Sequence, residues 1–369
     1  MSTPSSAEAQ APDASLADAG EAYSHKGLTY PFGRKAPEAD ELIPVADGVG
    51  WARLPVPGSL KHINVWALGD DAEVAGGVAL VDTGLDIPPS RETWEALLAG
   101  PLAGRTVTRI FVTHFHPDHI GLAGWLTERF GVALWMSREE WLFARMLTAD
   151  VRDAPPAEAV RHWRAAGWDE ARIEEEKAKG WGRFSAVVST VPVSFVRMRD
   201  GDAIRIGSRD WRVLIGSGHC PEHVCLVDEA GGVMIAGDQV LPRITSNVSL
   251  SVSEPEADPL GDWLDSIGKL KTLSDDLLVL PSHGEPFTGL HARLDALDHG
   301  HRDRLDALHL HLAAPRRAVD CFPILFGRKI DESVIGLATG EAMAHLRRLE
   351  VEGRASREVR DGVRWYSQA

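Results

Sequence analysis

Thr113-His-Phe-His-Pro-Asp-His-Ile-Gly121 is the stretch that decides the fold, because it gathers four metal-ligand side chains within six residues. These side chains are His114, His116, Asp118 and His119. Imidazole and carboxylate groups are the ligands that zinc and similar divalent metals prefer. A polar loop with unrelated histidines does not usually concentrate them in this way, so the stretch predicts a metal site.

The neighbours of this stretch predict how its side chains are aimed. The apolar run Val107–Val112 precedes it and is typical of a buried strand, and a helix is predicted after it over Ile120–Phe130. In an extended segment alternate side chains share one side, so the first two histidines point the same way. A turn at Pro117 can aim the aspartate and the third histidine elsewhere. The spacing therefore suits two neighbouring metals, one for each pair.

Three further apolar runs end in residues of the ligand type. The runs are Trp211–Ile215, Gly232–Ala236 and Leu277–Leu280, and the residues that follow them are His219, Asp238 and His283. Folds that combine strands with helices place their sites at the carboxyl ends of the strands. We therefore expect these three residues to share one site with the first four.

Together these residues form a series of motifs that resembles the metallo-β-lactamase-fold hydrolases. In order, the motifs are Val81-Asp82-Thr83-Gly84, His-x-His-x-Asp-His, Gly218-His219, Gly237-Asp238 and Ser282-His283-Gly284. The resemblance covers about residues 45–290. It implies an α/β fold, namely a four-layer αβ/βα metallo-β-lactamase sandwich, and a metal-dependent hydrolase.

The resemblance also implies which residues bind the metals. Metal one would be bound by His114, His116 and His219, and metal two by Asp118, His119 and His283, with Asp238 bridging both. Asp118 and Asp238 are thereby the expected catalytic residues. The cofactor is expected to be two divalent metal ions, zinc by default, although nitrogen and oxygen ligands also accept iron or manganese.

Residues around the ligands are expected either to support the ligands or to contact the substrate. By resemblance, Asp82 is expected to hold the metal-binding loop through hydrogen bonds, and His223 to stand beside the ligands without binding metal. The candidates for substrate contact are His62, Arg243, Ser246 and Asn247. The loop that carries the last three is equally consistent with a capped surface loop.

The chain is predicted to contain a leader, a catalytic domain and a tail. Residues 1–25 are rich in Ala, Ser, Pro and acidic residues and are expected to be a disordered leader, and residues 26–289 are expected to form the catalytic domain. About residues 137–190 predict a helical insert with helices over Glu139–Leu147, Ala157–Ala166 and Asp169–Phe184. Its tryptophans either pack these helices or form an apolar wall over the metals; they are Trp141, Trp163, Trp168 and Trp181.

The tail, residues 290–369, predicts a small winged-helix-like domain. Helices are expected over Leu290–Leu312, Arg316–Phe326 and Glu332–Glu350, and Asp361-Gly362 is a strong hairpin signal. Winged helices often bind nucleic acid, and the tail carries Arg347, Arg348, Arg354, Arg357, Arg360 and Arg364. Acidic residues interleave with these arginines, which favours a tail that packs on the catalytic domain or across a homodimer.

The composition of the chain limits the classes of partner that we expect it to bind. The formal net charge of −15 opposes binding to nucleic acid, because that affinity is built from Lys and Arg contacts with phosphates. Three cysteines without a pattern favour a reducing compartment. No stretch has the length of an apolar membrane span, and the first residues lack the features of a secretory signal. We therefore expect a cytoplasmic protein that acts on a small-molecule substrate, without nucleic acid or membrane as partner.

The expected reaction is hydrolysis by a hydroxide that bridges the two metals. A small-molecule acyl substrate, such as a thioester, a lactone or a related ester, is the leading interpretation. The first alternative is an endoribonuclease-type phosphodiesterase with a winged-helix tail. The second alternative is a metal-binding protein without catalysis.

Overall fold

Two β-sheets form the centre of the protein, which is described here from a computed structural model that covers residues 20–327 and 329–369. The first sheet contains, in spatial order, β3 (Ile43–Ala46), β4 (Val49–Pro55), β5 (His62–Gly69), β6 (Gly77–Val81), β7 (Thr106–Phe111), β8 (Leu134–Met136) and β9 (Val196–Arg197). The second contains β10 (Ala203–Ile206), β11 (Arg209–Gly216), β12 (His223–Asp228), β13 (Val233–Gly237) and β14 (Leu278–Pro281).

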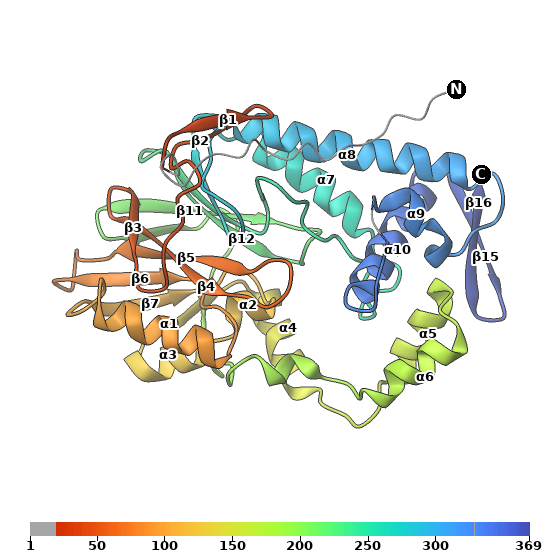
Figure 1. Ribbon diagram of the computed structural model, residues 1–369, viewed down its shortest axis with the longest axis horizontal. Helices are drawn as coiled ribbons and strands as arrows, with labels where there is room; N and C mark the ends of the chain where they lie inside the picture. Colours follow the sequence, from red (N-terminus) through yellow and green to blue (C-terminus); the bar gives the residue numbers. More distant parts are fainter. Residues whose placement is uncertain (1–19, 328) are drawn as a thin grey trace.

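Helices cover the outer face of each sheet, as Figure 1 shows. Helices α1 (Pro88–Ala99) and α3 (Ala123–Phe130) pack on the first sheet, and α7 (Pro259–Leu270) and α8 (Leu290–His311) pack on the second. A separate apolar cluster joins the two sheets and includes Trp51, Trp66 and Trp211. The expected four-layer sandwich is therefore confirmed.

The alternation of side chains in β6 explains how one strand serves two cores. Val78 and Leu80 belong to the cluster under the helices, whereas Ala79 and Val81 belong to the cluster between the sheets. Successive side chains of a strand point to opposite faces, so an apolar run with no polar position is the pattern of a strand buried on both sides.

Parallel pairing brings several strand ends to one edge of the sandwich. β6 pairs in parallel with β7, and β13 pairs in parallel with β14. The residues that directly follow these strands include Asp82, Asp238 and Ser282-His283. The predicted ligand motifs thus lie where parallel strands end, as expected for an α/β sheet.

The helix expected over Ile120–Phe130 is interrupted. The structure has α2 (Pro117–Ile120) and then α3, with Gly121 and Leu122 between them. A Cβ atom at Gly121 would lie 2.4 Å from the Gly84 carbonyl oxygen, so the chain passes too close to the loop after β6 for any larger residue. The next amide, that of Leu122, donates to the same Gly84 carbonyl at 3.0 Å, and this tertiary contact takes the place of the next helical hydrogen bond.

The insert leaves the first sheet after β8 and returns at β9, two strands that pair with each other in parallel. It contains α4 (Arg138–Ala149), α5 (Ala157–Ala166), α6 (Glu170–Ala178) and the 3₁₀ turn η2 (Arg183–Ala186). The single helix expected over Asp169–Phe184 is wrong beyond Ala178. Gly180 and Gly182 there have positive φ angles of 73° and 90°, which no helix continues through.

The tail contains η3 (Ala318–Cys321), α9 (Phe322–Leu325), α10 (Ile335–Val351), β15 (Ala355–Arg360) and β16 (Val363–Gln368). The hairpin predicted at Asp361-Gly362 is confirmed, since β15 and β16 pair around it. The continuous helix expected over Arg316–Phe326 is wrong. Pro323, which has no amide hydrogen to continue a helix, lies at the start of the separate short helix α9.

The tryptophans of the insert serve packing. Trp163 and Trp168 stack with ring centroids 5.4 Å apart, and Trp168 Nε1 donates to Thr339 Oγ1 of α10 at 2.9 Å. Helix α5 also contacts β16. Trp141 packs on the first sheet and donates to the Pro192 carbonyl at 3.0 Å. Of the two interpretations, packing therefore accounts for these three tryptophans.

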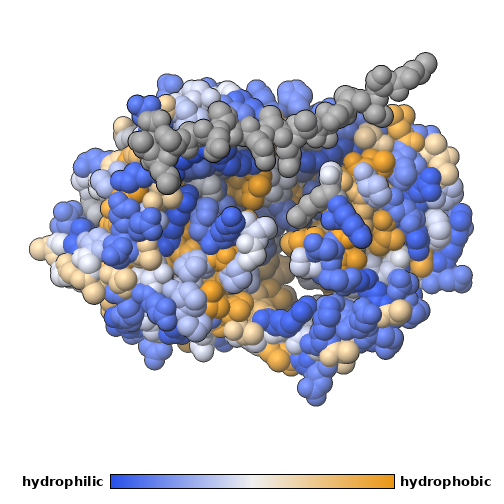
Figure 2. Space-filling model, viewed as in Figure 1, coloured by the Kyte–Doolittle hydropathy of each residue, from blue (hydrophilic) through white to orange (hydrophobic). Residues whose placement is uncertain are grey.

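The insert and the tail meet on the far side of a hollow. Figure 2 shows the surface hollowed between the sandwich and the part formed by α5, α6 and the tail, whose positions Figure 1 gives. Helix α4 lies between the sandwich and this part. The hollow thus borders the edge of the sandwich that carries the ligand motifs.

The expected leader is partly outside the described residues, which exclude 1–19. For the last residues of the leader the prediction of disorder is wrong, because Tyr23–His25 forms strand β1 and pairs with β2 (Leu28–Tyr30). The rings of Tyr23 and Tyr30 also stack with centroids 4.7 Å apart. Among the helices that the structure describes, none combines the length and the apolar character needed to cross a membrane.

Candidate metal centre

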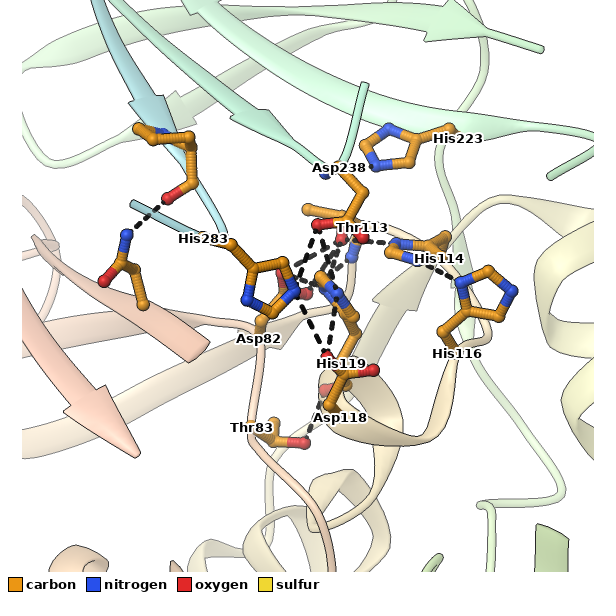
Figure 3. A network of polar contacts seen from close by, with 12 residues as sticks. Asp82, Thr83, Thr113, His114, His116, Asp118, His119, His223, Asp238 and His283 are labelled. Atoms are coloured by element: carbon orange, nitrogen blue, oxygen red, sulfur yellow. Dashed lines mark hydrogen bonds and ion pairs between the residues drawn. The ribbon is translucent and has the colours of Figure 1, made fainter. Parts of the chain in front are cut away.

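The structure brings all seven predicted ligand residues together in two adjoining groups. The first group is His114, His116, His219 and Asp238, and the second is Asp118, His119 and His283. Within each group the ligand atoms lie within 4.8 Å of one another. Figure 3 shows Asp238 between His283 and the pair formed by His114 and His116.

Asp238 faces both groups, one carboxylate oxygen to each. Its Oδ2 atom lies 3.5 Å from His219 Nε2. Its Oδ1 atom lies 3.5 Å from His283 Nε2 and 3.6 Å from His119 Nε2. A carboxylate in this position can bridge two cations.

The first group converges through imidazole nitrogens. His114 Nε2 lies 2.9 Å from His116 Nδ1 and 3.3 Å from His219 Nε2. Three such nitrogens and a carboxylate oxygen are the ligand set of a zinc site with four or five ligands. The second group converges on Asp118 Oδ2, which lies 3.3 Å from His283 Nε2 and 3.8 Å from His119 Nε2.

Unsatisfied atoms indicate that these groups fit metal ions. Among the described residues, the buried atoms His119 Nε2, His283 Nε2 and Asp238 Oδ1 have no hydrogen-bond partner. Buried polar atoms are almost always paired, so atoms that converge without partners are typical of a ligand site. The donor set of nitrogen and carboxylate oxygen fits divalent cations of the zinc, iron and manganese type.

Electrostatics also favours positive charge at this place. Burial lowers the pKa of His119, but the carboxylates of Asp82, Asp118 and Asp238 raise it more, to about 10. In the first group, burial and the neighbouring His219 lower the pKa of His116 to about 3. The second group thus attracts a cation, and the first offers neutral imidazoles, which is the form that binds metal.

The nitrogens that face away from the centre are held by fixed acceptors. His119 Nδ1 lies 2.8 Å from Asp82 Oδ2, and His283 Nδ1 lies 2.8 Å from the His62 carbonyl oxygen. Asp82 Oδ1 also accepts the backbone amide of Thr113 at 2.8 Å. Such contacts fix the tautomer and the direction of each imidazole. Asp82 therefore lies where the sequence predicted, as the support of the His-x-His-x-Asp-His loop.

Asp82 reaches this position through an unusual backbone. Its φ angle is 62°, in the left-handed region that aspartate and asparagine tolerate better than other residues with a side chain. This conformation follows directly on β6.

His223 lies beside Asp238 and outside both groups. Its Nε2 atom accepts the backbone amide of Asp238 at 3.0 Å. The hydroxyl of Ser246 donates to the carbonyl oxygen of the same aspartate. His223 and Ser246 therefore hold the backbone of Asp238 from two sides.

The four candidates for substrate contact are engaged within the protein. Ser246 is buried against Asp238, and the Asn247 carbonyl oxygen lies 2.7 Å from His219 Nδ1. The Arg243 guanidinium is held by both oxygens of Glu285, at 2.8 and 3.1 Å, and its contact with substrate stays a prediction. The His62 carbonyl supports His283, and burial, Arg53 and His283 lower the pKa of its ring to about 4.

Glu140 is a supporting residue that the sequence did not reveal. It is fully buried at the start of α4, and it accepts the backbone amides of Phe115 and Glu222 at 2.9 and 2.7 Å. Burial raises the pKa of its carboxyl to about 7. Glu140 thus ties the insert to the two loops that carry His114, His116 and His219. A glutamate in the first turn of a predicted helix gives no signal of such a role.

An apolar wall beside the first group is formed by Phe115 and by Phe143 of α4. The ring of Phe115 lies 4.7 Å from that of His116 and stacks on Phe143 at 5.4 Å. Leu142 and Met146 are one turn apart on the same helix, and 49% and 46% of their surface is exposed. Large apolar side chains that continue from a ligand site can receive an apolar part of a substrate.

Sequence profiles match two parts of the chain. The Metallo-beta-lactamase superfamily matches residues 61–283, and the Metallo-beta-lactamase-like C-terminal domain matches residues 305–369. The first match contains all seven residues of the two groups. The second contains α10 and the terminal hairpin.

Known proteins resemble most of the chain. A beta-lactamase domain protein from Burkholderia ambifaria, known from a crystal structure, is 41% identical with a TM-score of 0.86, and the match covers 93% of this chain and 98% of that one. The probable metallo-hydrolase YqjP of Bacillus subtilis is 25% identical over 81% of this chain and 91% of its own. The atrochrysone carboxyl ACP thioesterase of Emericella nidulans is 24% identical over 78% of this chain and 75% of its own.

Proposed function

The chain belongs to the metallo-beta-lactamase superfamily, and from this premise we propose that it is a dinuclear zinc hydrolase that cleaves small acyl thioesters. One observation carries the proposal: two adjoining sets of ligand atoms with the carboxylate of Asp238 facing both. A mononuclear site would use only one of these sets.

Bound at these positions, two divalent cations would lower the pKa of a water between them to about 7 and would stabilise negative charge on the reacting carbonyl oxygen. His114, His116 and His219 would hold one cation, and Asp118, His119 and His283 the other. Asp238 would offset the repulsion between the two positive charges. We assign Asp118 the secondary task of passing the proton to the leaving group.

The chain's own residues keep this centre in place before a substrate binds. Asp82 directs His119, and His223 and Ser246 fix the backbone of Asp238. Preorganised side chains need no rearrangement at the moment of reaction, which is the main source of electrostatic catalysis. Glu140 ties the loops of the first group to the insert.

The apolar wall of Phe115 and Phe143 supports an acyl group as the part of the substrate next to the metals. Burying a side chain's worth of apolar surface stabilises a complex by about 1.5–3 kcal/mol. The Emericella nidulans relative is a thioesterase, which favours a thioester over a lactone for this chain.

The tail gives no support for RNA as the substrate. The six arginines singled out in its sequence are paired with carboxylates of the protein: Arg357 and Arg364 with Glu256, Arg348 with Asp258, Arg354 with Asp306, Arg347 with Glu350 and Arg360 with Glu358. Two of these acceptors, Glu256 and Asp258, precede α7 of the catalytic domain. Arginines already neutralised in this way dock the tail and leave little charge for phosphates.

A substrate panel tests the proposal. The zinc-loaded protein is assayed on acetyl, octanoyl and benzoyl thioesters of coenzyme A and of glutathione, on a lactone series, and on a short single-stranded RNA. We expect thioester turnover that disappears when the metals are removed and returns with Zn²⁺. RNA cleavage that exceeds thioester turnover, or one metal equivalent per chain, would overturn it.

A further inference from the structure

Helix α10 of the tail is fastened to the loop that supports His219. The side-chain amide of Asn247 donates to Glu341 Oε2 at 3.1 Å and to the Leu337 carbonyl at 3.4 Å. Three residues further along the loop, the Leu250 amide donates to the Gly340 carbonyl at 3.0 Å. A stretch of loop thus follows one face of the helix for a full turn.

The helix and the loop approach each other closely at Gly340. A Cβ atom there would lie 2.6 Å from Ser249 Oγ and 2.7 Å from Ser249 Cβ, so a larger residue would push the loop away. Ser249 Oγ also donates to the Asn247 side-chain oxygen at 2.5 Å. The position of the Asn247 backbone is therefore set by contacts with α10.

The Asn247 carbonyl oxygen is the acceptor that directs His219. It lies 2.7 Å from His219 Nδ1, while His219 Nε2 points at His114 and Asp238 in the first group. A shift of this carbonyl would turn the imidazole and move its metal-binding nitrogen. The contacts given above for Asp82, Thr113 and His62 come instead from the catalytic domain itself.

Glu341 is an unusual residue to find at such a contact. Its carboxyl is largely buried, and burial raises its pKa more than Arg304 and Asn247 lower it. Burying a carboxyl costs free energy unless it is hydrogen-bonded. The Asn247 amide supplies that bond, so the two side chains hold each other in place.

We propose that Glu341 is a positioning residue for His219, so that the tail domain sets the affinity of the first metal position. The inference rests on the proposed assignment of His114, His116 and His219 to one cation. Contacts of this kind around metal ligands contribute about 10–100-fold to metal affinity. The tail is then part of the metal centre although it provides none of the seven ligands.

The experiment compares Glu341→Ala with Glu332→Ala in the full-length protein. Glu332 lies just before α10 and forms an exposed ion pair with Arg172, so its removal deletes the same charge without touching the loop. Zn²⁺ is titrated against a competing chelator to obtain the two dissociation constants. In Glu341→Ala we expect about tenfold weaker binding of one zinc, an unchanged second zinc and a lower kcat; Glu332→Ala should match the wild type.

Two further variants make the result decisive. Glu341→Gln keeps an oxygen that can accept the Asn247 amide, so it should restore most of the affinity. In a His116→Ala background, which lacks the first position, Glu341→Ala should leave the remaining zinc unaffected. Unchanged affinities in Glu341→Ala, or both zincs weakened alike, would overturn the inference.

The same titration separates this inference from the proposed function. A wild-type protein that binds only one zinc contradicts the dinuclear centre itself. A protein that binds two zincs, loses one selectively in Glu341→Ala and yet cleaves no thioester contradicts the substrate and leaves the positioning role in place.

Discussion

The two groups of the metal centre differ in what holds them. His119 and His283 of the second group are directed by Asp82 and by the His62 carbonyl, which lie directly after β6 and at the start of β5. His219 of the first group is directed by Asn247, in the long connection between β13 and α7. One half of the centre is thus built on strand ends, and the other depends on a loop.

The difference has a physical reason. Strand ends are fixed by the hydrogen bonds of the sheet, whereas a connection of this length has no such ladder and is ordered only by what it packs against. Here it packs on α10, through Asn247 and Leu250. A second domain thus contacts the support of a metal centre to which it gives no ligand.

The most damaging change should be one that affects both halves. Asp238→Ala removes the carboxylate that faces both groups, so two cations would repel each other without a shared anion. We expect kcat/KM for thioesters to fall on the order of a hundredfold or more, which is about 3 kcal/mol of barrier. The zinc content of the variant is measured together with its kinetics. A variant that keeps two zincs and most activity would show that Asp238 does not bridge the metals.

A change confined to the strand-end half should be next in size. Asp82→Ala removes the acceptor of His119 Nδ1 and of the Thr113 amide, and we expect 10–100-fold weaker zinc binding at the second position. Asp82→Asn is the control, because asparagine also tolerates the φ angle of 62° and retains one oxygen. If Asp82→Ala and Asp82→Asn weaken zinc binding equally, the negative charge of Asp82 is what matters. If zinc binding weakens at the first metal position instead, the two groups are not supported separately as described above.

The packing behind α10 should make the tail sensitive to acid. His301 Nδ1 and His345 Nε2 lie 3.3 Å apart, and both side chains are fully buried. Burial and the nearby Arg304 lower the pKa of His301 to about 3, although Asp298 opposes this shift. They also lower the pKa of His345 to about 4, although its hydrogen bond with the Glu341 carbonyl opposes the shift. A folded-state pKa below 6.5 means that the unfolded chain takes up protons first as pH falls. Stability is therefore complete above pH 6.5 and declines toward pH 4, by up to about 1.4 kcal/mol per pH unit for each histidine.

Urea unfolding at several pH values measures this effect. His345→Leu should show a shallower loss of unfolding free energy between pH 6.5 and 4.5 than the wild type, by about 1 kcal/mol per pH unit. Both proteins carry the same metal ligands, so their titration cancels in the difference. Equal slopes would show that the acid sensitivity lies in the sandwich and not in the tail.

The smallest expected effect concerns the apolar wall. Phe143→Ala removes the ring that stacks on Phe115, so octanoyl thioesters should lose several-fold more kcat/KM than acetyl thioesters. Leu98→Ala serves as a control for packing, since Leu98 lies against the cluster between the first sheet and its helices. An equal loss for long and short acyl groups would show that the wall does not contact the acyl chain.

The sequence predicted the parts of the centre whose chemistry is local. The ligand residues lie in loops that follow strands or, for Asp118 and His119, in the short helix α2. Several have a recognisable neighbour, such as Gly237 before Asp238 or Gly284 after His283, and the structure brings all seven together. The four-layer sandwich was implied by the family resemblance that these motifs carry. These features depend on residues that are close in the chain or repeat with a strand's period.

Other parts could not be predicted, because they depend on contacts between distant segments. Glu140 reaches loops that lie 25 and 82 residues away, and Asn247 meets Glu341 across 94 residues. Ser246 and Asn247 were predicted only as candidates for substrate contact, and the sequence does not say that they support Asp238 and His219. Arg243 likewise gave no sign that Glu285 would hold it.

The path of the insert has a consequence for how molecules reach the metals. The insert is joined to the first sheet at both ends and to the tail through Trp168 and α5, and the tail is joined to the sandwich through α10. The chain therefore encircles the hollow seen in Figure 2. A closed ring cannot swing open at one joint without breaking another. The width of the opening is therefore held jointly by the contacts of Trp168, α5 and α10, and it can change only where one of them is broken.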